Sequence, residues 1–182
     1  MVTFPIIETT RLFLNEIKHT DVPIIVNYAS NKKVSDFTQN IPYPYAEEDA
    51  KIWIIAAQEG FEKGTQFTFA IRLKPGNQFI GGIGLKKDRK HHRAELGYWI
   101  AEKFWNHGYA TEAARALVKY GFQNINLNKI TASHFAENFA SGKVLTHCKM
   151  IREGVLKEQI FKNEIYNDLI IYGLTKEDYY FS

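Results

Sequence analysis

The chain has little cysteine, no long apolar run and no strong excess of charge. Its 182 residues include one cysteine, Cys148, so no disulfide can form within the chain, which fits a reducing compartment. No uninterrupted apolar stretch approaches the roughly 20 residues that a membrane-spanning helix needs. Residues 1–5 lack the basic region and apolar run of a signal peptide. We therefore expect a cytoplasmic protein without a membrane partner.

The charges are nearly balanced. Lys and Arg number 23 and Asp and Glu 20, so the formal net charge is +3. The one basic run, residues 86–93, lies between two strand-like segments, and we interpret it as a solvated hairpin loop rather than a nucleic-acid site. His91 and His92 are adjacent and lack the spacing of a helical metal pair. We predict neither a nucleic-acid partner nor a metal site.

What the chain does have is a series of strand and helix patterns without repeats, low-complexity tracts or linkers, which predicts a single domain over residues 1–182. Apolar periodicity predicts strands at residues 11–17, 67–71, 79–85, 94–101, 129–134, 155–161 and 165–174, and helices at about residues 22–29, 46–61, 111–122 and 138–148. A run of antiparallel strands followed by a strand-helix-strand step implies an α+β (mixed α/β) fold. We expect about four helices to flank a mixed, mostly antiparallel twisted sheet of about seven strands.

The most informative segment is the one in which the strand at 94–101 runs through a short loop into a helix near Gly108. The first amides of a helix have no partner inside the helix and carry the positive end of its dipole. A loop that turns around Gly108 can direct several of them at one diphosphate. By itself this pattern is also typical of an ordinary helix N-terminus.

The full string is more specific. Residues 97–100 read Gly-Tyr-Trp-Ile, and residues 104–113 read Phe-Trp-Asn-His-Gly-Tyr-Ala-Thr-Glu-Ala. This string resembles the GNAT acetyltransferase superfamily, and within it the Rim-type branch that acetylates the N-termini of ribosomal proteins. Gly108 and Ala110 match the superfamily's Arg/Gln-x-x-Gly-x-Gly/Ala motif. Asn106 and His107 depart from the Gly-Lys of the branch, and Lys149 stands where the branch has a glycine.

The resemblance extends over nearly the whole chain and implies acetyl-CoA as co-substrate. It implies a sheet that splays into a V between the strands at 94–101 and 129–134, the fourth and fifth of the series. The pantetheine arm would pair with the backbone near Trp99, and the diphosphate would lie on the amides of residues 106–111. The predicted cofactor-binding residues are Trp99, Ile100, Ala101, Asn106, His107, Gly108, Tyr109, Ala110, Thr111 and Asn138.

The family mechanism implies direct attack of a neutral amine on the thioester in a ternary complex. The reference pKa of an α-amino group is about 7.7–8.0 and that of Lys about 10.4, so an N-terminal acceptor needs only a modest base. We predict Glu95 as this base, with Glu158 as second choice. Many relatives protonate the leaving thiolate with a Tyr, but the matching position here is Leu145. Ser141 is therefore the predicted donor.

The sequence leaves alternatives open. Transfer through an acetylated Cys148 is one, although a small buried thiol is the favoured interpretation of that residue. The predicted acceptor is a protein N-terminal amine. A polyamine or aminoglycoside is the alternative, with the carboxylates of residues 47–49 as its candidate partners. A non-catalytic acetyl-CoA-binding module is a further alternative, and both a monomer and a homodimer remain possible.

Overall fold

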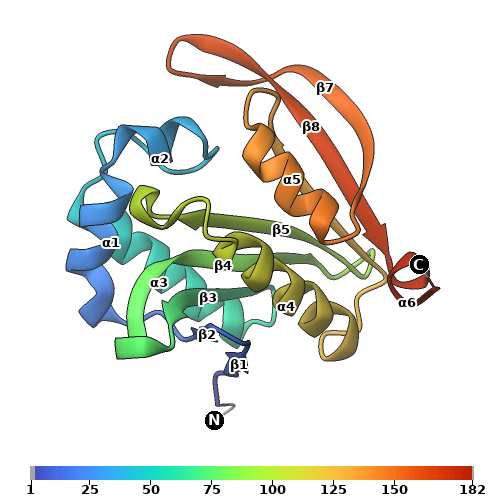
Figure 1. Cartoon of the computed structure of the whole chain (residues 1–182), viewed down its shortest axis with the longest axis horizontal. Coiled ribbons are helices and arrows are strands. Elements are labelled where there is room, and N and C mark those ends of the chain that lie inside the picture. Colours follow the sequence, from blue (N-terminus) through green and yellow to red (C-terminus); the bar gives the residue numbers. More distant parts are fainter. Residues whose placement is uncertain (1–2, 182) are drawn as a thin grey trace.

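A computed structural model describes residues 3–181. Eight strands form one sheet in the order β1-β2-β3-β4-β5-β6-β8-β7 (Figure 1). The strands are β1 (Ile7–Glu8), β2 (Leu12–Asn15), β3 (Gln66–Leu73), β4 (Gln78–Asp88), β5 (Arg93–Ile100), β6 (Lys129–Phe135), β7 (Ile151–Lys162) and β8 (Ile165–Thr175). All neighbouring strands are antiparallel except β5 and β6, which are parallel. The predicted mixed, mostly antiparallel sheet is confirmed.

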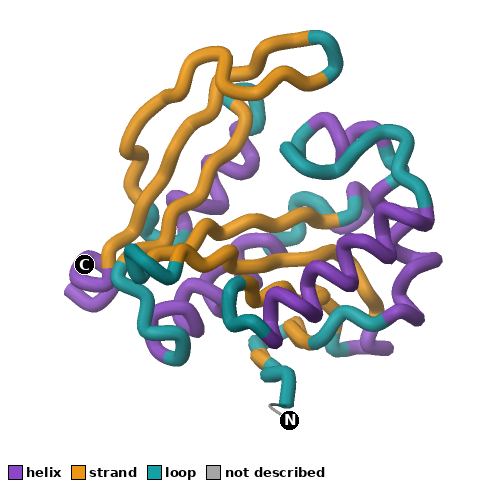
Figure 2. The backbone as a smooth tube through the Cα atoms, turned by 180° about the vertical axis from the view of Figure 1, so that it is seen from behind, coloured by secondary structure: helices purple, strands orange, loops and turns teal. Residues whose placement is uncertain are grey.

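Helices cover both faces of this sheet. They are α1 (Val22–Ala29), α2 (Lys32–Asp36), α3 (Glu47–Glu62), α4 (Tyr109–Gln123), α5 (Phe139–His147) and α6 (Lys176–Phe181). The front face carries α4 and α5 (Figure 1), and α1 and α3 cross the other face (Figure 2). Successive side chains of a strand point to opposite faces. Accordingly, Phe69 of β3 joins the apolar core under α4, while Ala70 joins the one under α1 and α3.

Local sequence explains where the two longest helices begin. The carboxylate of Asp49 accepts a hydrogen bond from the amide of Ala46 at 2.7 Å, which caps α3, and three acidic residues occupy its first turn. In α4 the apolar stripe that includes Ala113, Leu117 and Val118 is buried against the sheet. The buried stripe of α4 is the apolar periodicity from which this helix was predicted.

The sheet splays apart between β5 and β6. Arg93–Leu96 pairs with Lys129–Ala132, and no pairing continues beyond Leu96 among the described residues. Gly97–Ile100 therefore lies along an open gap, and the predicted V is confirmed at the expected strands. The sheet halves on either side of this gap are its two arms.

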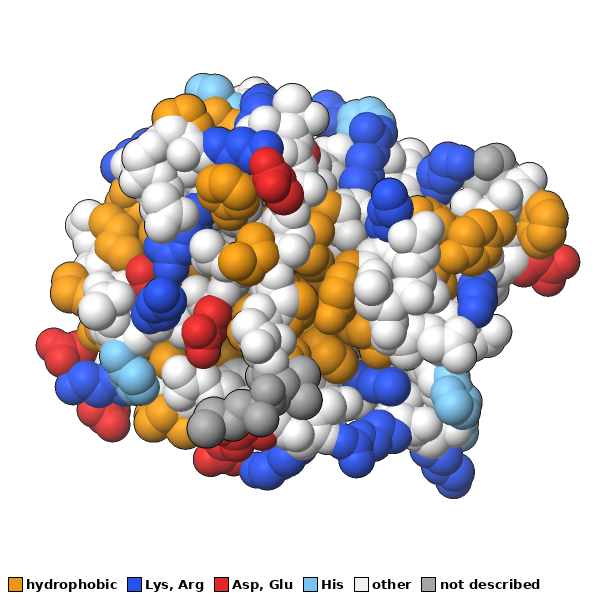
Figure 3. Space-filling model, turned by 90° about the horizontal axis from the view of Figure 1, so that it is seen from below, with side chains coloured by type: hydrophobic (Ala, Val, Ile, Leu, Met, Phe, Trp, Pro, Cys, Tyr) orange, Lys and Arg blue, Asp and Glu red, His pale blue; other side chains and the backbone are white. Residues whose placement is uncertain are grey.

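The seven predicted strands and four predicted helices are all present, and β1, α2 and α6 were not predicted. The basic run forms the predicted hairpin loop, since β4 ends at Asp88, β5 starts at Arg93, and the Asp88 carboxylate accepts from the amide of Lys90. Charged side chains of both signs are spread over the face in Figure 3. No helix in residues 3–181 is long and apolar enough to cross a membrane, and no group of His, Cys, Asp or Glu side chains in that range could hold a metal ion.

Candidate active site

The loop before α4 turns through two left-handed residues. Gly108 has φ 77° and Asn106 has φ 62°. Asn is one of the few non-glycine residues that adopt this conformation readily, so Asn106 can serve where the resemblance led us to expect glycine. Within the part of the chain that the structure describes, nothing accepts a hydrogen bond from the amides of residues 106–111. The first bond of the helix runs from the amide of Glu112 to the carbonyl of Gly108, at 3.1 Å.

A polar network fixes this loop from the N-terminal strands. The Glu112 carboxylate accepts from the Thr9 hydroxyl (2.6 Å), the Arg11 amide (2.8 Å) and Arg11 Nε (2.6 Å). Burial raises the pKa of Glu112, but these hydrogen bonds outweigh it and the pKa is lowered overall. Arg11 Nη1 donates to the carbonyl of His107 at 2.9 Å, and the guanidinium lies 4.6 Å from the centre of the Tyr109 ring. The loop carbonyl is thus engaged by the protein while the amides remain free.

The edge of β5 that faces the gap offers fewer backbone groups than expected. The amide of Ala101 donates to the carbonyl of Ile80 at 2.9 Å, so it is not available to a cofactor. In an antiparallel ladder the backbone N–H and C=O groups of alternate residues point to alternate edges of the strand. The backbone groups of Trp99 therefore also point at β4, where Gly82 is its register partner. The groups directed at the gap belong to Tyr98 and Ile100. The Ile100 carbonyl already accepts from a tryptophan indole at 2.6 Å.

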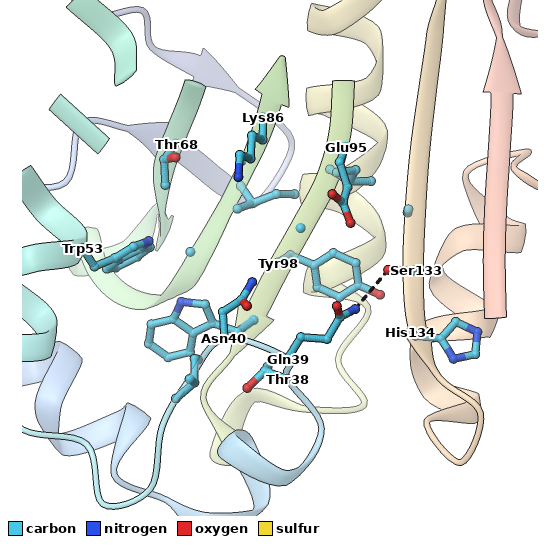
Figure 4. Close-up of a pocket in the computed structure, with 18 of the residues that line it drawn as sticks. Thr38, Gln39, Asn40, Trp53, Thr68, Lys86, Glu95, Tyr98, Ser133 and His134 are labelled. Atoms are coloured by element: carbon cyan, nitrogen blue, oxygen red, sulfur yellow. Dashed lines mark hydrogen bonds between the residues drawn. The ribbon is translucent and has the colours of Figure 1, made fainter. Parts of the chain in front are cut away.

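A cavity of about 580 Å³, which we call the gap cavity, opens on the α3 side of the sheet (Figure 4). Residues 37–42, the roof segment, cover it, and α3 contributes Trp53. Its lining includes Ser141 of α5, so the cavity reaches through the gap to the helices of the other face. Gly84 and Gly97, register partners on β4 and β5, also line it. A Cβ atom at Gly97 would meet nothing within 4 Å, so the backbone is open to a bound molecule there.

Comparisons with known proteins agree with this geometry. A family model described as an acetyltransferase (GNAT) domain matches residues 11–151. The chain belongs to the GNAT acetyltransferase family. It is 31% identical to the uncharacterised N-acetyltransferase YoaA of Bacillus subtilis (strain 168) over 95% of this chain and 98% of YoaA. As a GNAT protein it is an acetyl-CoA-dependent N-acetyltransferase, and acetyl-CoA is its co-substrate.

Solved GNAT structures share the fold. The ribosomal L7/L12 alpha-N-protein acetyltransferase RimL, in complex with coenzyme A, superposes with a TM-score of 0.87 at 18% identity, covering 96% of this chain and 99% of RimL. Spermidine N-acetyltransferase from Vibrio cholerae, in complex with CoA and spermine, gives a TM-score of 0.82 at 21% identity, covering 94% and 99%. These two likenesses concern the fold, and the two named acceptors differ.

The acid–base candidates of this GNAT site differ in whether they line the gap cavity. Glu95 is exposed and lines the gap cavity, and Ser141 is half-buried in its lining (Figure 4 shows Glu95). The second-choice base, Glu158, does not line the gap cavity. It lies on β7 outside the cavity lining, at a bulge where its amide donates to the Asp168 carboxylate at 2.8 Å.

Sequence reasoning missed Tyr98. Its hydroxyl donates to the backbone carbonyl of Ser141 at 3.5 Å, a long bond, and burial raises its pKa to about 12. A tyrosine hydroxyl from β5 therefore lies beside the start of α5, although position 145 of α5 is leucine. The signal was available in the alternation of Leu96, Tyr98 and Ile100, which places the Tyr98 side chain on the α5 side of the sheet.

Two further candidates are constrained by their partners. Asn138 caps α5: its Oδ1 accepts from the amide of Ser141 at 3.1 Å, and its Nδ2 donates to the carbonyl of Phe37 at 3.2 Å. Its carboxamide therefore keeps only part of its hydrogen-bonding capacity for a cofactor. Cys148 is buried and outside the cavity lining, and burial raises its pKa to about 11. A protonated thiol there is a poor nucleophile, which argues against transfer through an acetyl-cysteine.

Proposed function

We propose that this GNAT enzyme acetylates the α-amino group of a protein N-terminus, in the cytoplasm, by direct attack in a ternary complex. The observation that carries the proposal is the gap cavity, which opens on the α3 side and reaches α5 through the gap. The free amides of residues 106–111 begin α4, on the opposite face. Acceptor and acetyl-CoA can therefore approach the same gap from opposite faces, which is what an in-line transfer requires.

On this proposal the cofactor binds along the open edge of β5. The amides of residues 106–111 take the diphosphate, because they are unpartnered and lie at the positive end of α4. The peptide-like pantetheine arm pairs with Tyr98 and with the amide of Ile100, as an added strand would. The remaining N–H of Asn138 contributes from α5. We retain Ala101 and Trp99 only as neighbours of the arm, since their amides face β4.

The proton transfers fall on opposite faces of β5. Glu95 and Tyr98 are three residues apart, so their side chains point to opposite sides of the sheet. Glu95, on the acceptor side, accepts the proton that the amine loses as the new N–C bond forms. On the α5 side the C–S bond breaks and the thiolate takes a proton from Ser141 or Tyr98. A phenol releases a proton more readily than an aliphatic hydroxyl, which favours Tyr98. Comparing the turnover of Ser141→Ala and Tyr98→Phe distinguishes the two.

The polar lining of the gap cavity favours a peptide over a polycation. Among its described lining residues, the fully charged side chains are Asp49, Lys86 and Glu95, so two carboxylates are offset by one ammonium. The carboxamides of Gln39 and Gln66 can both donate and accept, which suits peptide groups. A polyamine is the second candidate, because a spermidine acetyltransferase shares the fold and both acidic residues line the cavity.

A panel of acceptors tests the proposal. The purified protein is incubated with acetyl-CoA and with peptides of varied N-terminal residue, spermidine, spermine and an aminoglycoside, and release of free CoA thiol is followed. We expect N-terminal peptides to be acetylated with kcat/KM at least about tenfold above the polyamines, which corresponds to about 1.4 kcal/mol of transition-state preference. The same peptides with a blocked N-terminus serve as the control. If only polyamines are acetylated, the proposed N-terminal acceptor is wrong and the acceptor is a polyamine.

A further inference from the structure

Lys162, at the end of β7, directs its ammonium group at backbone carbonyls of α2 and of the roof segment. Its Nζ donates to the carbonyls of Ser35 (2.8 Å), Thr38 (2.6 Å) and Ile41 (2.8 Å). A lysine ammonium has three N–H donors, so all three are used. Partial burial lowers the pKa of Lys162, because the group has given up part of its water, and the three carbonyls replace that water. The three acceptors begin at the end of α2 and continue into the roof segment.

The geometry of the β7–β8 hairpin places this lysine. Asn163 and Glu164, the two residues between the strands, both have left-handed φ angles, of 53° and 63°. This is the pattern of a tight two-residue hairpin turn. Lys162 and Ile165 pair across its base. Asn163 then makes a second contact to α2, since its Nδ2 donates to the Asp36 carboxylate at 2.8 Å.

The roof segment therefore joins the two arms of the splayed sheet. It follows α2, on the arm that contains β1 to β5, yet its ties lead to the other arm. Gln39 Nε2 donates to the Ser133 hydroxyl of β6 at 3.0 Å (the dashed line in Figure 4), and the Phe37 carbonyl accepts from Asn138. Lys162 adds three bonds from the hairpin tip. Near the tips of both arms in Figure 1, α2 approaches the end of the hairpin.

We propose that Lys162 is a positioning residue that fixes the roof segment over the gap cavity and so sets the shape of the acceptor site. Its own side chain is not among the cavity-lining residues, and it acts through the carbonyls that it binds. This proposal rests on the proposed function in one respect, the assignment of the gap cavity to the acceptor. It predicts that the hairpin tip governs binding of the amine and has no effect on binding of acetyl-CoA.

The test compares Lys162→Met with Lys157→Met. Methionine keeps an unbranched side chain as far as Cε and removes the ammonium group, with its charge and its donors. Lys157 is the matched control because it lies on the same strand and pairs with Asp168 at 2.7 Å, with 79% of its side chain exposed. Two quantities are measured: hydrogen–deuterium exchange of the amides of residues 35–42, which needs no substrate, and steady-state kinetics with the best amine of the acceptor panel.

For Lys162→Met we expect exchange in residues 35–42 to accelerate at least about tenfold, since loss of even one charge-assisted hydrogen bond changes an opening equilibrium by about that factor. KM for the amine should rise by a similar factor, while KM for acetyl-CoA stays within about twofold. Lys157→Met should change neither quantity. Lys162→Arg keeps the charge and the donors, so its exchange rate in residues 35–42 and its KM for the amine should stay close to those of the wild type. If Lys162→Met does not fold, Asn163→Gly, which tolerates the left-handed turn, removes the Asp36 contact and should give a smaller effect in the same direction.

Three results would overturn the proposal: unchanged exchange in residues 35–42, an unchanged KM for the amine, or equal increases in both KM values, which would indicate a general loss of structure. If the panel finds no acceptor at all, the proposed function fails, whereas the exchange measurement still decides whether Lys162 fixes the roof.

Discussion

At the scale of single residues, the proposed acceptor site gives Gly97 a role, because this glycine leaves the backbone of β5 open to the gap cavity. Its φ is not in the left-handed region, so alanine can adopt the same backbone conformation. The added methyl group would meet no protein atom within 4 Å and would project into the gap cavity. The glycine is therefore required by neither backbone nor packing, and the open floor that it leaves in the cavity is the remaining explanation.

We therefore predict that Gly97→Ala raises KM for the accepted amine about tenfold, a loss of about 1.4 kcal/mol of binding. The free energy of unfolding should stay level or increase by about 0.4–1 kcal/mol, because alanine restricts the unfolded chain. Gly154→Ala on β7 is the control, since a Cβ atom there also meets nothing within 4 Å and lies outside the cavity. Steady-state kinetics and urea unfolding of both variants provide the comparison. Equal KM values for Gly97→Ala and the wild type would refute this role for Gly97.

Residue roles could be predicted only where a local pattern fixes them. The amides around Gly108 are free because a loop enters a helix there. The resemblance to a family showed which of the chain's loops this was. Local alternation fixes the face of β5 on which the Tyr98 side chain lies, but not the point at which β5 leaves β6, so the sequence did not show that Tyr98 borders an open gap. The amide of Ala101 was expected to be free because its partner, the carbonyl of Ile80, lies on another strand. Glu158 lies outside the cavity lining because β8 and β6 separate β7 from β5, and this strand order is a property of the whole sheet.

At the scale of elements, the end of α5 contains an unusual residue. Lys149 has φ 64°, and the amides of Lys149 and Met150 donate to the carbonyls of Thr146 and Leu145. These two bonds form a Schellman motif, in which the left-handed position is usually glycine. The replacement of glycine by lysine put this turn in question at the level of sequence. The turn forms nonetheless, with a backbone conformation that is unfavourable for lysine.

We predict that Lys149→Gly is more stable than Lys149→Ala by about 1 kcal/mol, because only glycine adopts this φ without steric cost. In a protein of this size the difference corresponds to about 2–4 °C in Tm. Comparing the two variants with each other removes from both the contacts of the lysine side chain, so the difference reports on the backbone alone. Differential scanning calorimetry measures it. An alanine variant as stable as the glycine variant would mean that the helix end has relaxed.

The elements that the sequence did not predict share a physical cause. β1, α2 and α6 have two, five and six residues, too few for a periodic apolar pattern. α2 illustrates the point, since its C-terminal end is bound by Lys162, which is more than a hundred residues away in the chain. Long elements such as α4 were predictable because each buries a periodic stripe of its own.

At the scale of the whole molecule, the arms of the sheet are joined by the short β5–β6 pairing and the roof segment, so a ligand that binds in the gap should stabilise the protein. We predict that acetyl-CoA at about 100 times its Kd raises the free energy of unfolding by about 2.7 kcal/mol, which corresponds to an increase of about 5–10 °C in Tm. Gly108→Ala should lose this shift, because a left-handed alanine is strained and the loop amides must move. Gly76→Ala is the matched control: its φ of 71° imposes the same strain at a turn outside the gap, so its lower Tm should still rise with acetyl-CoA. Were both variants to keep the shift, the loop before α4 would not be the diphosphate site.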